Sequence, residues 1–174
     1  MLCSMFLALM MMPTISALAQ DSSKVLVAVG KEVRTETISP GTVTCENGQP
    51  TGQIPPCSPS TTKIVLRGMS NKYVAQDVSG TATAYLGGWN ITNVNADLDS
   101  GWYGHMWGTA EWTVPDMGGV WQGTFSVVAD QGKGIVVNKA IFYGSGGKLE
   151  GLKMEFYAVT MGTESTFIAF ITKQ

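Results

Sequence analysis

The sequence is poor in charge. Only 14% of its 174 residues are charged, whereas charged residues make up about a quarter of an average soluble domain. The 11 basic residues are outnumbered by 13 acidic ones, and the formal net charge is -2. Proteins that bind nucleic acid need a concentration of Lys and Arg that neutralises phosphate groups. We therefore do not expect nucleic acid as a partner.

Histidine and the common catalytic motifs are also scarce. His105 is the single histidine, which excludes a metal site built from several histidines. The chain has no G-x-S-x-G nucleophile motif, no H-E-x-x-H zinc motif and no phosphate-binding loop. We predict no catalytic residue, no metal and no cofactor, and we lean away from an enzyme.

A helical hydrophobic period is missing as well, while glycine is abundant at 21 residues. Short runs rich in Val, Ile, Thr and aromatic residues alternate with Gly-rich clusters, which is typical of strands and tight turns. Short connections make neighbouring strands antiparallel, and a long meander tends to close because closure removes exposed edges. We predict one all-β domain, an up-and-down antiparallel barrel of about eight strands, with a sandwich as the alternative. The predicted strands cover 24–34, 62–68, 80–86, 89–97, 103–114, 120–130, 134–143, 148–159 and 165–172.

The N-terminus reads MLCSMFLALMMMPTISALAQ, an apolar run without a preceding Lys or Arg. Ala17-Leu18-Ala19 has the small-x-small pattern that signal peptidase accepts, which predicts a signal peptide at 1–19 and a mature domain at 20–174. A membrane anchor is the alternative, but Ser, Thr and Pro interrupt a run already shorter than a span requires. We expect a secreted or periplasmic protein without stable insertion into a membrane.

Cysteine is rare, and its placement is informative. Cys3 would leave with the signal peptide, so that Cys45 and Cys57 remain in the stretch CENGQPTGQIPPC. In an exported protein, two cysteines this close in sequence predict a disulfide that closes a loop with no core of its own.

Glycine and tryptophan recur through GGWNITNVNADLDSGWYGHMWGT, GGVWQGTF and GSGGKLEGLKMEF. In these stretches, over roughly 79–172, the chain resembles exported bacterial proteins of unknown function, and its hairpins are similar in style to the allene oxide cyclase and dirigent type of barrel. The resemblance implies a small calycin-like or cyclase-like barrel, often oligomeric, whose apolar cavity receives a lipid-like or phenolic molecule. No active-site motif of the plant cyclase can be placed on this chain.

Segment 103–114 holds the candidate ligand site. Successive strand residues point to opposite faces, so Tyr103, His105 and Trp107 share one face. The opposite face is more apolar, which favours His105 outside, and pairing of Pro115 with Val120 would agree. A shift of one residue would instead place His105 in a cavity. We select as candidate ligand contacts the aromatic residues and the histidine of this strand and the next: Tyr103, His105, Trp107, Trp121 and Phe125.

Together these features predict an exported barrel that binds a small, largely apolar molecule and performs no chemistry of its own. One alternative is a cyclase or isomerase that acts on a lipid-like or phenolic substrate. Another is a structural or surface module whose exposed aromatic residues contact a protein or a glycan. A homo-oligomer is compatible with each of these readings.

Overall fold

The computed structural model describes residues 25–51, 57–99, 103–130, 135–161 and 164–174. The predicted signal peptide at 1–19 lies outside these residues. Within the described part of the chain, no helix has the length and hydropathy needed to cross a bilayer.

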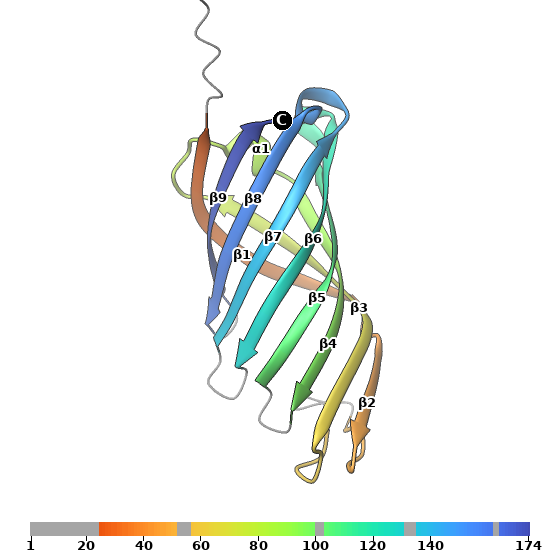
Figure 1. Ribbon diagram of the computed structural model, residues 1–174. Helices are drawn as coiled ribbons and strands as arrows, with labels where there is room; N and C mark the ends of the chain where they lie inside the picture. Colours follow the sequence, from red (N-terminus) through yellow and green to blue (C-terminus); the bar gives the residue numbers. More distant parts are fainter. Residues whose placement is uncertain (1–24, 52–56, 100–102, 131–134, 162–163) are drawn as a thin grey trace, which may run out of the picture.

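A single antiparallel sheet of nine strands curls into a barrel (Figure 1). Its spatial order is β1-β9-β8-β7-β6-β5-β4-β3-β2, and a direct pairing of β1 with β3 closes it. Eight strands thus form the closed barrel and β2 is an extra strand, which confirms the predicted all-β, up-and-down barrel. The strands are β1 (Leu26–Ser39), β2 (Thr42–Glu46), β3 (Lys63–Asp77), β4 (Trp89–Asp99), β5 (Tyr103–Val114), β6 (Gly119–Asp130), β7 (Ile135–Ser145), β8 (Leu152–Met161) and β9 (Glu164–Lys173).

The predicted strand at 80–86 is wrong. Asp77 organises this segment as a turn, because its carboxylate accepts the backbone N–H groups of Ser79 at 3.0 Å and Ala82 at 2.7 Å. The short helix α1 (Thr83–Leu86) follows and lies at one end of the barrel (Figure 1). Leu86 is only 1% exposed there. The alternating TATAYL pattern of the segment therefore comes from a turn and a short helix that bury Ala82 and Leu86, and not from a strand.

Three stretches of strand were not predicted from the sequence, namely residues 35–39 of β1, the whole of β2 and the second half of β3. In β3, Gly68 adopts a φ of 69°, and the pairing with β4 shifts register between Leu66 and Met69. Beyond this bulge, the inner face of β3 carries Asn71 and Tyr73. Because these inner residues are polar, the segment lacks the apolar alternation by which a half-buried strand is recognised.

Aromatic side chains fill one part of the barrel interior. Trp112 meets the rings of Phe142 and Phe156 edge to face, with centroid separations of 6.2 and 6.0 Å. Phe156 also stacks on Phe167 at 4.9 Å. We call these four residues the aromatic cluster. Edge-to-face pairs stabilise a core beyond the area that they bury.

Candidate functional site

The pairing of β5 with β6 decides which face of segment 103–114 lies inside. Pro115–Met117 form a tight 3₁₀ turn that ends at Gly118 with a φ of 64°, so Thr113 pairs with Val120. The predicted partner of Val120 was Pro115, which is two residues away. Because strand side chains repeat every two residues, this difference leaves the faces unchanged. His105 is exposed on the outer face, as the apolar pattern favours.

The five predicted ligand contacts do not form one site. Tyr103 and His105 are exposed on the outer face of β5, and Trp107 is half-buried on the same face. Trp121 and Phe125 lie inside the barrel with 0% and 9% exposure. The barrel wall therefore separates Tyr103 and His105 from Trp121, whereas Trp107 and Phe125 both line the groove described below, and a role of these residues in ligand binding stays a prediction.

His105 belongs to a small polar and aromatic cluster on the outer surface. Its Nε2 lies 2.9 Å from the hydroxyl of Ser126, and its ring stacks on Trp107 at 5.2 Å. The guanidinium of Arg67 lies 5.2 Å from the Trp107 ring and forms an ion pair with Asp97 at 2.8 Å. These contacts explain how an imidazole is accommodated in an aromatic strand on the outer face.

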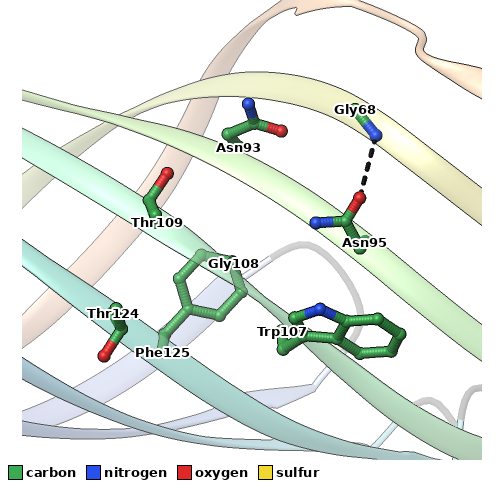
Figure 2. A pocket seen from close by; sticks show the side chains of 8 residues that line it. All are labelled: Gly68, Asn93, Asn95, Trp107, Gly108, Thr109, Thr124 and Phe125. Carbon is green, nitrogen blue, oxygen red and sulfur yellow. Dashed lines mark hydrogen bonds between the residues drawn. The ribbon is translucent and has the colours of Figure 1, made fainter.

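An open groove lies next to this cluster on the outer face (Figure 2). It has a volume of about 520 Å³. The Asn95 amide is fixed at its edge, because its Oδ1 accepts the backbone N–H of Gly68 at 3.2 Å. The lining combines short polar side chains with aromatic rings: Gly68, Asn93, Asn95, Trp107, Gly108, Thr109, Thr124 and Phe125.

A second hollow lies inside the barrel, and we call it the lumen cavity. Its volume is about 100 Å³. The adjacent strands β1, β3 and β4 contribute a polar wall, defined as Glu32, Tyr73, Asn90 and Thr92. Strands β6, β7 and β8 contribute a largely apolar wall: Phe125, Val127, Val136, Ala140, Phe142, Phe156 and Ala158. Asn138, Thr160 and Ser165 are polar residues at the same cavity.

Glu32 is the acidic group of the lumen cavity. It is 7% exposed, and it follows Ala28 and Gly30 on the inner face of β1. The Asn90 side-chain amide donates a hydrogen bond to Glu32 Oε1 at 3.3 Å. Burial raises the pKa of Glu32 to about 7, and the hydrogen bond from Asn90 only partly opposes this effect. A carboxyl group therefore changes charge near neutral pH inside the barrel.

Two further acceptors at the cavity have no partner. Asn90 Oδ1 and Asn138 Oδ1 are buried and form no hydrogen bond among the described residues. A buried polar atom left unsatisfied costs about 1–3 kcal/mol. The groove on the outer face is larger than the lumen cavity, but it is open to solvent, which can satisfy its polar groups. The buried acceptors therefore place the candidate functional site in the lumen cavity.

Sequence reasoning missed Glu32, Asn90 and Asn138. Residues around Glu32 do alternate between the two faces of β1. The face opposite Glu32 carries Val27 and Val29 and is the more apolar one, so the pattern would have turned Glu32 outward. A usable signal would have been Asn90 and Thr92, which share the face of Val94 on a strand whose inner side is otherwise apolar.

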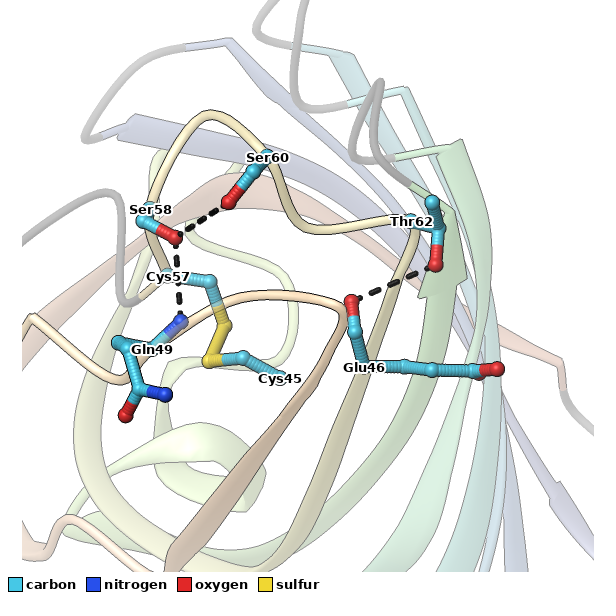
Figure 3. Close-up of a disulfide and its surroundings, with 7 residues drawn as sticks. All are labelled: Cys45, Glu46, Gln49, Cys57, Ser58, Ser60 and Thr62. Atoms are coloured by element: carbon cyan, nitrogen blue, oxygen red, sulfur yellow. Dashed lines mark hydrogen bonds between the residues drawn. A yellow bond between two sulfur atoms is a disulfide. The ribbon is translucent and has the colours of Figure 1, made fainter.

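The Cys45–Cys57 disulfide is confirmed, with a Cα–Cα distance of 5.8 Å (Figure 3). Next to it, the hydroxyl of Ser58 accepts the backbone N–H of Gln49 at 3.1 Å. Cys57 is buried in a second hydrophobic cluster that includes Ala96 and Leu98 of β4. Among the described residues, no group of three or more His, Cys, Asp or Glu side chains is placed to hold a metal ion.

The fold defines a closed antiparallel barrel with a polar group inside its lumen. Searches of protein-family models, curated proteins and solved structures find no match to this chain. Barrels of this kind serve many unrelated functions, so the architecture does not identify a cyclase or dirigent family.

Proposed function

We propose that the protein binds a small, largely apolar molecule in the lumen cavity and performs no chemistry of its own. The observation that best supports this proposal is a pair of buried acceptors without a hydrogen-bond partner, Asn90 Oδ1 and Asn138 Oδ1, at a cavity with one apolar wall. A ligand with a polar end would satisfy these atoms and place its hydrocarbon part against Phe125 and Phe156. Sites of this kind, apolar with a few placed polar groups, are typical of small-molecule binding.

The volume of the cavity bears on the size of the ligand. Drug-sized ligands occupy pockets of about 300–1,000 Å³, and the lumen cavity measures about 100 Å³. This favours a short molecule over the lipid-like or phenolic substrate of the cyclase alternative. An enzyme of that kind would need Glu32 or Tyr73, the titratable groups at the cavity, as its acid or base, since His105 faces outward. Loss of turnover in Glu32→Gln, with folding intact, would support the enzyme.

We test binding by native mass spectrometry of the mature protein purified under mild conditions. A stoichiometric small molecule is expected in the wild type. Val136→Phe fills the cavity from inside and should abolish binding. Val137→Phe is the matched control, because Val137 is the next residue of β7 and points outward with 51% exposure. If the wild type carries no passenger and added short amines, alcohols and acids do not bind, the cavity holds only water and the proposal fails.

We also propose export to a secreted or periplasmic location. The disulfide supports it, since such bonds persist in oxidising compartments. The intact mass should show removal of residues 1–19 and the loss of two hydrogen atoms on oxidation of Cys45 and Cys57 to the disulfide. A reduced, full-length chain in the cytoplasm would contradict export. The same spectrum reports whether the protein is a homo-oligomer.

A surface module is the second candidate function, favoured by the groove on the outer face. Trp107 together with Asn93, Asn95 and Thr109 offers an aromatic surface beside amide and hydroxyl groups, a combination that suits a glycan. Trp107→Ala should then weaken binding of soluble oligosaccharides. Trp89→Ala is the control, because Trp89 lies on the outer face of β4 and does not line the groove. Equal binding by both variants would exclude this function.

A further inference from the structure

The polar side chains at the lumen cavity offer mostly hydrogen-bond acceptors. Asn90 uses its Nδ2 group to donate to Glu32, which leaves its Oδ1 free. Asn138 Oδ1 is free as well. The hydroxyls of Thr160 and Ser165 already bond each other at 2.6 Å. The Tyr73 hydroxyl adds a donor at the cavity, but the buried atoms left without a partner there are the two amide oxygens, so a ligand that completes the site brings hydrogen-bond donors to them.

The charge at the cavity points in the same direction. None of the residues that line it is Lys, Arg or His, so the Glu32 carboxylate has no cationic partner there. A buried carboxylate without such a partner is costly, and a cation in the cavity would stabilise it. A carboxylate ligand would add a second negative charge and leave the Asn acceptors unsatisfied. A neutral alcohol would supply one donor and no charge.

We propose that the lumen cavity selects a small primary amine in its ammonium form, held by Glu32, Asn90 Oδ1 and Asn138 Oδ1. An ammonium group has three N–H donors and a positive charge, and the cavity presents two free amide oxygens and a carboxylate. The hydrocarbon part of the amine packs on the apolar wall, and the volume of about 100 Å³ restricts it to a short chain. This inference rests on the proposed function and specifies its ligand.

The first test compares three probes of similar size, n-propylammonium, n-propanol and propionate, by isothermal titration calorimetry on the mature protein at constant ionic strength. We expect propylammonium to bind at least about tenfold more tightly than propanol, and propionate not to bind. Glu32→Gln should lose this preference and still bind propanol. Glu36→Gln, an exposed carboxylate of the same strand, should behave as the wild type.

Proton release is a readout that a merely structural role of Glu32 would not produce. An ammonium ion favours the ionised carboxylate, so binding near pH 7 should release a fraction of a proton from Glu32. Tyr73 on β3 is the other titratable group that lines the cavity, and Arg34, two residues beyond Glu32 on β1, acts electrostatically on Tyr73. Strands β4, β7 and β9 contribute the uncharged side chains of Asn90, Asn138 and Ser165 to the lining. Titrations in two buffers of different ionisation enthalpy measure the release, which should vanish in Glu32→Gln.

The outcomes separate this inference from the proposed function. Amine preference and proton release that both depend on Glu32 support the inference. If propanol binds as tightly as propylammonium or more tightly, or if Glu32→Gln keeps the preference for the amine, the proposed selection of an ammonium ligand is wrong, while binding in the lumen still stands. Binding of none of the three probes to the wild type overturns both.

Discussion

The aromatic cluster and the polar wall occupy the same barrel interior and differ in chemistry, although each holds a buried polar atom without a partner among the described residues, Trp112 Nε1 and Asn90 Oδ1. In the cluster, Trp112 packs edge to face against Phe142 and Phe156, and Trp112 is 0% exposed. The polar wall keeps Glu32 and Asn90 buried beside a cavity, with one amide oxygen unpartnered. Burial of apolar rings stabilises the fold, whereas burial of an unpaired carboxyl group opposes it. The comparison teaches that the cluster stabilises the fold whereas the polar wall opposes it, which is the difference expected if the polar wall serves the binding proposed above.

The largest expected effect comes from breaking the cluster. Trp112→Ala should lower the free energy of unfolding by about 4 kcal/mol, because it leaves a cavity among Phe142 and Phe156. Urea denaturation measures the change. Trp89→Ala, at a site that is 36% exposed, is the control and should cost much less. Equal losses in the two variants would contradict the role assigned to the cluster.

The free energy of unfolding should depend on pH because the polar wall contains the buried Glu32. Glu32 has a pKa of about 7 in the folded protein against an ordinary value of 4.5, so the folded state holds this proton more tightly than the unfolded state. Stability from this group is therefore greatest below about pH 4.5 and falls as pH rises to about 7, by about 3 kcal/mol in all. Urea denaturation of ligand-free protein at pH 5 and pH 8 measures the loss.

Glu32→Gln isolates this effect from the other carboxylates, because it removes only the titration inside the cavity. The variant should lose most of the pH dependence, whereas Glu36→Gln should keep it. The quantity to compare is the difference in unfolding free energy between wild type and Glu32→Gln. If this difference is the same at pH 8 as at pH 5, burial does not destabilise the ionised carboxyl group.

The disulfide loop is a third region to compare. It contributes to stability by restricting the unfolded chain and not by packing in the barrel interior. Replacing Cys45 and Cys57 by Ser should cost about 2.9 kcal/mol from the chain entropy of a loop of this length. Lumen binding should be unchanged, since neither cysteine lines the cavity. Denaturation and the propylammonium titration on the double variant check both statements, and loss of binding in a folded variant would refute the second.

The smallest effect is expected at His105. His105→Ala removes an exposed ring, its contact with Trp107 and its 2.9 Å hydrogen bond to Ser126. Surface changes of this kind usually alter stability by less than about 1 kcal/mol. Binding in the lumen should not change, and a titration of the variant with the same probes measures this. Abolished binding would mean that the outer face communicates with the cavity.

Sequence reasoning succeeded where local chemistry decides the structure. Hairpins and strands such as 103–114 follow from turn residues and β propensity. The outward position of His105 followed from a more apolar opposite face, although the pairing was two residues off because Pro115 itself belongs to the turn, which ends at Gly118. Patterning failed where α1 imitates a strand and where the inner face of β3 is polar.

The alternation in β1 shows why the site itself escaped prediction. Val27 and Val29 are the more apolar residues, yet Ala28, Gly30 and Glu32 line the interior. Closure makes this choice: a Cβ at Gly30 would lie 2.6 Å from the Phe167 ring and 2.1 Å from the Gln76 carbonyl oxygen. Small residues are needed where β1 meets both β3 and β9, and the valines are turned outward.

The amino-acid sequence by itself determined the succession of antiparallel strands, the disulfide and the lack of metal-binding histidines, because each depends on residues that are close in the chain or on composition. Only the tertiary structure decided which face of each strand forms the lumen and that Glu32, Asn90 and Asn138 meet there. Side chains of a strand alternate with a period of two, and this period does not say which of the two faces lies inside. The choice between the faces is made by closure of β1 on β3, which depends on the packing of distant strands.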